Sequence, residues 1–165
     1  MNSTTSTPNP IIFDLIALTK PRVNFLIIFT AIVGMLLAQD FNLNYSLMIY
    51  ASIGIYLAAS AAAVINQIVD QKIDAIMDRT KSRPLIKGNV TSKHAIYFSI
   101  IISLISTYIL YEYVNTITTV LTLFSIIVYS IIYSVYLKNL TSQNIVIGGI
   151  AGAMPPLLGW TAITN

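Results

Sequence analysis

The sequence passes directly from an uncharged apolar segment to a charged one at residue 66. Residues 46–65 read SLMIYASIGIYLAASAAAVI, and residues 66–85 read NQIVDQKIDAIMDRTKSRPL, with three aspartates and four basic residues. About 20 predominantly apolar residues span a bilayer as a helix, so the first segment predicts a transmembrane helix. The second predicts a polar region at the membrane edge, because charged side chains are expensive within the hydrocarbon core.

The composition of the whole chain is that of a membrane protein. Its 165 residues are 56% hydrophobic and 9% charged, whereas about 25% of residues are charged in soluble domains. The predicted fold class is therefore all-α, a polytopic bundle of transmembrane helices. The sequence has no cysteine, which excludes disulfides, thiolate metal sites and cysteine nucleophiles. Five segments have the length and apolarity of a span: 22–39, 46–65, 94–112, 116–137 and 144–163.

The first ten residues, MNSTTSTPNP, have neither the basic residues nor the apolar run of a targeting segment. We expect them to form a disordered tail, with the transmembrane domain over residues 11–165. Within this domain, the polar region 66–93 is called the aspartate-rich segment below. The absence of a targeting pattern favours a bacterial cytoplasmic membrane over an organellar one.

The positions of the basic residues predict the orientation of the chain. They all precede the first span, separate the second from the third, or follow the fourth, and the connections on the other side carry Asp40 and Glu112 as their charged residues. Lys and Arg accumulate in cytoplasmic loops, so we expect the N-terminus and the aspartate-rich segment to be cytoplasmic. This use of positive charge leaves no reason to expect a nucleic-acid partner. The nine basic residues are Lys20, Arg22, Lys72, Arg79, Lys81, Arg83, Lys87, Lys93 and Lys138.

Two groups of small residues predict close packing of helices. The second span contains the run AASAAA at residues 58–63, and small side chains let helix backbones approach one another. The fifth span combines several glycines with Pro155 and Pro156. Irregular backbone is tolerated at membrane depth where it is buried or lines a cavity, so this span is either a cavity wall or a kinked helix.

Asn66, Asp70, Asp74 and Asp78 are spaced four residues apart. If the second helix continues beyond the membrane edge, these residues share one face. Like charges at this spacing destabilise a helix, and carboxylates near its C-terminus oppose the helix dipole. We therefore expect a cation at this site, supplied by a divalent metal, by neighbouring basic side chains, or by both.

The chemical type of these side chains restricts the metal and its partner. Carboxylate and amide oxygens are hard ligands, which favour Mg²⁺ over zinc or copper. Mg²⁺ commonly keeps positions for water and substrate phosphates. The basic residues that follow can bind phosphate oxygens, the arginines through two parallel hydrogen bonds. These residues are Arg79, Lys81, Arg83 and Lys87.

The aspartate-rich segment resembles a family motif. NQIVDQKID at 66–74, followed by DRTKSRPL at 78–85, looks like the first aspartate-rich motif, N-x-x-x-D-x-x-x-D, of the intramembrane prenyltransferases of the UbiA superfamily. Two further blocks are similar to the protoheme IX farnesyltransferase, or heme o synthase, branch of that superfamily. They are LTKPRVNFLIIFTAIVGMLLA at 18–38 and LTSQNIVIGGIAGAMPPLLGW at 140–160.

The resemblance implies nine transmembrane helices around a central cavity and an Mg²⁺-dependent reaction. In that reaction a farnesyl group passes from farnesyl diphosphate to a vinyl group of heme b (protoheme IX), and water supplies a hydroxyl, giving heme o. Asn66, Asp70 and Asp74 match the catalytic metal-binding positions, and Asp78 matches a variable position that we include last among the metal ligands. Arg79 and Arg83 match the basic residues that hold diphosphate. Lys20 and Arg22 match the opening motif of the family, where they either contact substrate or set orientation.

The family carries a second aspartate-rich motif after its sixth helix. We therefore expect this chain to be the N-terminal part of such an enzyme and to be inactive by itself. Two other functions remain open. A prenyltransferase with a quinone-precursor or aromatic acceptor would keep the same aspartates, and a transporter bundle would use Asp70 and Asp74 as a cation site. The sequence does not reveal an oligomeric state.

Overall fold

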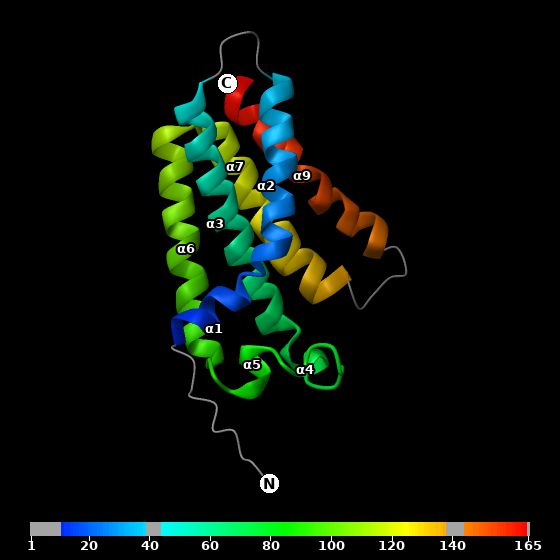
Figure 1. The fold of residues 1–165 in the computed structure, drawn as a ribbon. Coiled ribbons are helices and arrows are strands. Elements are labelled where there is room, and N and C mark those ends of the chain that lie inside the picture. Colours follow the sequence, from blue (N-terminus) through cyan, green and yellow to red (C-terminus); the bar gives the residue numbers. More distant parts are fainter. Residues whose placement is uncertain (1–10, 39–43, 138–143, 165) are drawn as a thin grey trace.

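The computed structural model describes residues 11–38, 44–137 and 144–164, and every regular element in these ranges is a helix (Figure 1). The tail at residues 1–10, and also Asp40 and Lys138, lie outside the described residues. The helices are α1 (Ile11–Leu18), α2 (Pro21–Ala38), α3 (Tyr45–Val69), α4 (Gln71–Asp74), α5 (Pro84–Lys87), α6 (Ser92–Tyr113), α7 (Thr116–Ile127), η1 (Val128–Leu137) and α9 (Asn144–Thr164).

Four helices of the described part are long and apolar enough to cross a membrane. They cover Pro21–Ala38, Tyr45–Val69, Ser92–Tyr113 and Thr116–Ser134, and so confirm the first four predicted segments to within a few residues. The fifth predicted segment forms α9. The protein is a multi-pass membrane protein whose successive long helices alternate in direction (Figure 1).

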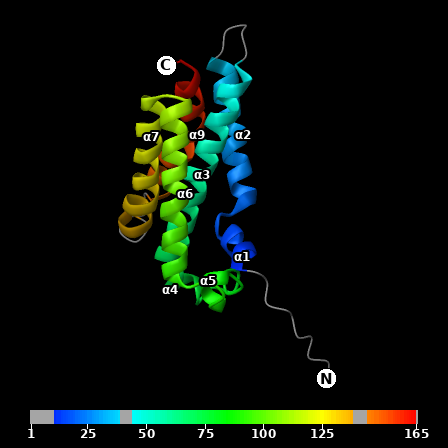
Figure 2. The same cartoon turned by 90° about the vertical axis from the view of Figure 1, so that its left-hand side faces the viewer.

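Helix α3 lies at the centre of the bundle. Half of its 18-residue membrane window is buried, compared with 22% for α2 and 28% for α6. Its buried positions are mostly small residues, including Ala51, Ala58 and Ala61, which agrees with the expected close packing. Helix α6 lies along α3 (Figure 2), and α2 and α9 also pack against α3.

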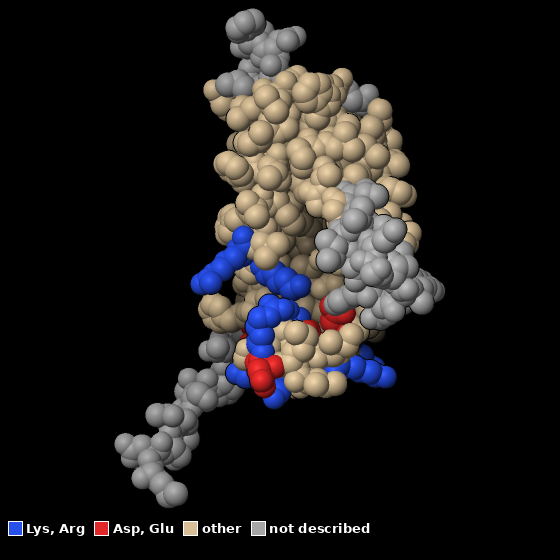
Figure 3. All heavy atoms as spheres, turned by 90° about the vertical axis from the view of Figure 1, so that its right-hand side faces the viewer, with Lys and Arg blue, Asp and Glu red and all other residues tan. Residues whose placement is uncertain are grey.

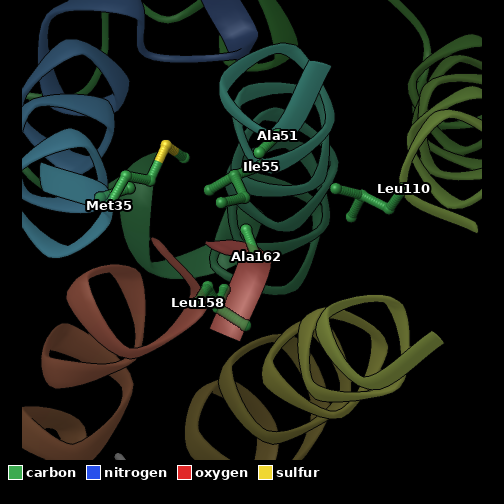
Figure 4. Close-up of a cluster of buried hydrophobic side chains, with 7 residues drawn as sticks. Met35, Ala51, Ile55, Leu110, Leu158 and Ala162 are labelled. Carbon is green, nitrogen blue, oxygen red and sulfur yellow. The ribbon is translucent and has the colours of Figure 1, made fainter. Parts of the chain in front are cut away.

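One apolar cluster joins α2, α3, α6 and α9 at the end opposite the aspartate-rich segment. Met35, Ile55, Leu110 and Leu158 converge there (Figure 4), and each is at most 4% exposed. A second cluster at the other end contains Leu18, Val64, Leu85, Val90 and Ala95. Because Leu85 and Val90 belong to the aspartate-rich segment, the second cluster fixes this polar segment against the end of the bundle.

The backbones of α2 and α9 touch where they cross. A Cβ atom on Gly34 would overlap the carbonyl oxygen of Pro156, and one on Gly159 would overlap that of Ala31. Small residues permit this approach. The helix assignment of α9 continues through Pro155 and Pro156.

The fourth predicted segment changes its helix type near the middle. The sequence predicted one helix over 116–137, whereas α7 ends at Ile127 and the π-helix η1 follows. The Ser134 hydroxyl donates to the carbonyl oxygen of Tyr129, five residues earlier, at 2.9 Å. π-Helical turns are frequently found at functional sites, and this one places Ser134 against α3.

Charged side chains gather at one end of the molecule, below a largely uncharged body (Figure 3). This end contains α4, α5 and the start of α2 (Figure 1). The grouping agrees with the predicted separation of charge between the two membrane faces. That this end faces the cytoplasm stays a prediction.

Candidate functional site

A cavity of about 580 Å³ lies between α2, α3, α7, η1 and α9. The space-filling view is hollowed on this side, just above the charged end (Figure 3). Most lining residues are small or apolar, among them Leu26, Ala59 and Ala62. Gly148, Gly152 and Pro155 also line it, so the fifth segment is a cavity wall, one of the two alternatives for its glycines and prolines.

Lys20 lies where this cavity meets the charged end. It lines the cavity, and it joins the end of α1 to Pro21, the first residue of α2. Its φ angle of 53° lies in the left-handed region, which is uncommon for residues other than glycine. The backbone amide of Lys20 donates to the carbonyl oxygen of Ala17 at 3.3 Å, and its carbonyl oxygen accepts from the amide of Val23 at 3.0 Å.

Two buried side chains hold this junction in place. Gln67 of α3 donates from Nε2 to the carbonyl oxygen of Leu18 at 2.6 Å. Asn24 of α2 donates from Nδ2 to the carbonyl oxygen of Thr19 at 2.9 Å and to Oγ of Ser60 at 2.8 Å. The two residues preceding Lys20 are therefore tied by hydrogen bonds to α3 and α2.

Asn66 connects Lys20 to the π-helix. Its Oδ1 accepts from Lys20 Nζ at 3.3 Å, and its Nδ2 donates to Ser134 Oγ at 2.8 Å. Asn66 is 7% exposed, so both hydrogen bonds satisfy a buried amide, as burial of polar groups requires. The arrangement fixes the orientation of the amide.

Asp70 and Asp74 continue from Asn66 at the end of α3. Asp70 is the C-terminal cap of α3, and its backbone amide donates to the carbonyl oxygen of Asn66 at 3.0 Å. The amide of Asp74 donates to the carbonyl oxygen of Asp70 at 2.8 Å. As whole residues, Asp70 and Asp74 are 6% and 5% exposed. Asp74 forms an ion pair with Arg83 through Oδ2, and its carbonyl oxygen accepts from Thr80 Oγ1 at 2.8 Å.

Asp78 does not share this face. Helix α3 ends at Val69, α4 adds one turn, and the chain then forms turns until α5 begins at Pro84. The condition for one common face, a helix that continues to Asp78, is therefore not met. Repulsion between carboxylates at a helix C-terminus opposes such an extension, and Thr80 instead closes the turn after Asp74.

The remaining predicted residues lie on the surface of the aspartate-rich segment. Asp78 pairs with Lys81 at 2.7 Å, and their side chains are 97% and 55% exposed. Arg79 and Lys87 are also exposed. The structure thus brings together Asn66, Asp70, Asp74, Arg83 and Lys20, and leaves Asp78, Arg79, Lys81 and Lys87 at the periphery.

The donor set suits Mg²⁺ in its chemistry. Within the described ranges, no three His, Cys, Asp or Glu side chains lie close enough together to hold a metal ion. Asp70 and Asp74, with the Asn66 amide, provide the one or two carboxylates that Mg²⁺ commonly takes from a protein. Arg83 pairs with Oδ2 of Asp74, and a carboxylate has further lone pairs on its other oxygen. The residues present therefore fit a magnesium ion whose other ligands are water and phosphate.

Sequence reasoning did not identify the residues that orient this site. Asn24 and Gln67 are 1% and 3% exposed within largely apolar helices, and buried amides require hydrogen-bond partners. The presence of amide side chains in apolar helices could have indicated them, but the sequence does not tell which backbone groups they bind. Ser134 gave no signal, because its position depends on the π-helix.

Comparisons with known proteins identify the family. A model described as the UbiA prenyltransferase family matches residues 27–165. Three curated relatives are named protoheme IX farnesyltransferase. The protein from Hahella chejuensis is 50% identical over 152 residues, which cover 92% of this chain and 51% of the relative. The protein from Alcanivorax borkumensis is 53% identical over 154 residues, covering 92% and 51%. The protein from Ruthia magnifica subsp. Calyptogena magnifica is 52% identical over 158 residues, covering 94% and 53%.

The chain spans about half the length of the curated relatives it matches. No solved structure matches it. The family model extends over most of the chain and includes the whole aspartate-rich segment. This chain belongs to the UbiA prenyltransferase family.

Proposed function

We propose that the protein acts as a protoheme IX farnesyltransferase, transferring a farnesyl group from farnesyl diphosphate to a vinyl group of heme b to give heme o. The observation that carries this proposal is about 50% identity, across 92% of the chain, to curated relatives of that name. The site supports it, since an apolar cavity that Lys20 lines, with buried carboxylates and the partly buried Arg83 in the adjoining segment, suits a substrate with an apolar chain and an anionic head.

Asn66, Asp70 and Asp74 would hold magnesium in this proposal. When bound, the metal supplies positive charge that stabilises the departing diphosphate. Arg83, already oriented by Asp74, adds a cation that can bind phosphate through two parallel hydrogen bonds. Arg79, Lys81 and Lys87 supply further positive charge at the surface of the segment.

The reaction begins as the bond between C1 of farnesyl and the diphosphate oxygen breaks, with the electron pair leaving on the diphosphate. The cavity limits access of water to the allylic cation because its lining is mostly apolar. The vinyl group of heme b then donates its π electrons to C1, forming the carbon–carbon bond. Water adds to the resulting cation and loses a proton, which gives the hydroxyl group.

Substitution of the aspartates by asparagine tests the site without changing its shape. In membranes that contain the full-length enzyme and are supplied with farnesyl diphosphate, heme b and Mg²⁺, we expect Asp70→Asn and Asp74→Asn to lower heme o formation by about 100-fold or more, as loss of a group that stabilises developing charge does. Asp78→Asn is the matched comparison, with an expected effect of about fivefold at most because its ion pair is exposed. A chelator should abolish turnover, and added Mg²⁺ should restore it.

The same assay separates the alternative acceptors. Near-normal turnover of both Asp70→Asn and Asp74→Asn would contradict the metal assignment. Farnesyl transfer to an aromatic or quinone precursor, but not to heme b, would contradict the acceptor assignment alone. A transporter is disfavoured because the described spans carry no carboxylate within their apolar interiors, where a transport pathway would need one.

We propose further that the aspartate-rich segment faces the cytoplasm of a bacterial inner membrane. The chain has no cysteine, so labelling of a single introduced cysteine shows on which side of the membrane that residue lies. Ser82 in the segment and Ser46 at the opposite end are both exposed. In intact cells, an impermeant thiol reagent should label the cysteine of Ser46→Cys and not that of Ser82→Cys. After lysis, it should label both. The reverse pattern would contradict the proposed orientation.

A further inference from the structure

We propose that Lys20 binds the diphosphate of the prenyl substrate, at the point where the apolar cavity meets the aspartate-rich segment. The inference rests on the proposed function. It extends the diphosphate site to a residue of the first helical junction, 46 residues from Asn66 in the sequence.

The first argument is position. Lys20 lines the cavity and also donates from Nζ to Oδ1 of Asn66. A substrate whose apolar chain lies in the cavity and whose anionic head lies against Asn66, Asp70 and Asp74 must cross the boundary between the two. Lys20 places a cation at that boundary.

The second argument is the backbone. Lys20 is the single non-glycine residue with a positive φ in the described ranges. Such conformations persist where the surroundings determine them, and they occur often at active sites and ligand clamps. Here the side chains of Gln67 and Asn24 bind the carbonyl oxygens of Leu18 and Thr19. The left-handed turn at Lys20 ends α1, since the amide of Lys20 donates to the carbonyl oxygen of Ala17, as is common at a helix C-terminus. It starts α2 beside the cavity and so places the lysine at the boundary.

The third argument is chemical. A lysine ammonium is a compact cation with three N–H donors, and it binds phosphate as a point charge. The hydrogen bond to Asn66 fixes the ammonium next to a residue assigned to the metal site. A diphosphate held there would accept from Lys20 on one side and face Asn66 and the aspartates on the other.

Arg22 provides a matched control within the same turn of chain. It carries the same charge two residues away, and its side chain is exposed. Among the described residues it takes part in no ion pair with an acidic side chain. If charge near the membrane face were the whole function, the two residues would be equivalent.

The experiment measures binding without turnover. Purified full-length enzyme in detergent, with Mg²⁺ and no heme, is titrated with radiolabelled farnesyl diphosphate and separately with farnesol, which has the same chain and no phosphate. We expect Lys20→Met to weaken binding of farnesyl diphosphate about tenfold or more, as loss of a hydrogen bond to a charged group does. Farnesol binding should be unchanged. Lys20→Arg should restore much of the affinity, and Arg22→Met should bind both ligands like the unmodified protein.

Each other outcome overturns the proposal. Equal losses in Lys20→Met and Arg22→Met would mean that general charge matters, and equal losses for both ligands would mean that Lys20 only maintains the fold. If Lys20→Met binds farnesyl diphosphate normally while Asp74→Asn does not, the inference fails and the proposed function stands. If the unmodified protein binds no farnesyl diphosphate, both fail. Size-exclusion chromatography verifies folding, and Lys20→Gln replaces Lys20→Met under the same criteria if the latter aggregates.

Discussion

Lys20 and Asn66 are 46 residues apart in the sequence and are joined by a hydrogen bond of 3.3 Å from Nζ to Oδ1. The same amide donates to Ser134 of η1 at 2.8 Å. One buried side chain thus connects the start of α2, the end of α3 and the π-helix, three elements that border the cavity. The geometry of the polar site and the shape of the cavity are therefore coupled through Asn66.

The hydrogen bond between Asn66 and Ser134 should contribute measurably to stability. We expect Asn66→Ala to lower the free energy of unfolding by about 1–3 kcal/mol, because it leaves buried partners unsatisfied. In a double-mutant cycle with Ser134→Ala, the two effects should be non-additive by about 0.5 kcal/mol or more. Unfolding in mixed detergent micelles measures both quantities. Strict additivity would contradict the contact, and exposed Asn89→Ala serves as the control for loss of an amide.

The ion pairs Asp74–Arg83 and Asp78–Lys81 of the aspartate-rich segment should differ in strength. Arg83→Met leaves the Asp74 carboxylate without its cation, on a side chain that is 7% exposed, and loss of one partner of a buried pair costs about 3–5 kcal/mol. Since Arg83 is 21% exposed on its side chain, we expect the lower end of that range. Lys81→Met disrupts the exposed pair with Asp78 and should cost about 1 kcal/mol at most. Similar unfolding midpoints for Arg83→Met and Lys81→Met would contradict the predicted difference in the contribution of the two ion pairs.

The crossing of α2 and α9 should not tolerate added side chains. Gly34→Ala and Gly159→Ala each place a Cβ against a backbone carbonyl of the other helix, and overpacking of this kind costs about 1–3 kcal/mol. Gly149→Ala is the control, since its Cβ would meet no atom of another described segment within 4 Å, and alanine favours a helix by up to about 1 kcal/mol over glycine. Thermal stability in detergent gives the comparison, and equal behaviour of the three variants would contradict the close crossing.

Thr122 and Thr118 provide a matched pair on α7. Thr122 Oγ1 is buried with no hydrogen-bond partner among the described residues, whereas Thr118 Oγ1 donates to Thr161 Oγ1 at 3.1 Å. We expect Thr122→Val to keep or slightly raise stability, because it removes an unsatisfied hydroxyl, and Thr118→Val to cost about 1 kcal/mol. An equal loss in Thr122→Val would contradict the premise that its hydroxyl lacks a partner.

Much of the fold could be predicted from the sequence because spans are set by length and apolarity. Segments 22–39, 46–65 and 94–112 correspond closely to α2, α3 and α6. The π-helix after Ile127 could not be predicted, since the residues of 116–137 are uncharged throughout and their pattern is compatible with either helix type. The hydrogen bond from Asn66 to Ser134 of η1 could not be predicted either, because it depends on how α3 packs against η1.

The sequence predicted only in part which polar residues lie near one another, and the metal at this site stays a prediction. Spacing indicated that Asn66, Asp70 and Asp74 lie together, but it also included Asp78, which the turn after α4 carries to the surface. The sequence did not distinguish between substrate contact and orientation as the role of Lys20, because it cannot show a left-handed φ or a hydrogen-bond partner 46 residues away.

Length, apolarity and charge placement are enough to predict a helical membrane protein with carboxylates and cations concentrated at one edge, because hydrocarbon excludes charge over any stretch of about 20 residues. Which of those charges meet is visible only in the folded bundle. Arg83 reaches Asp74, Lys20 reaches Asn66, and Asp78 faces solvent. The reason is that such pairing depends on where each helix ends and on how neighbouring helices pack, and both are properties of the assembled bundle.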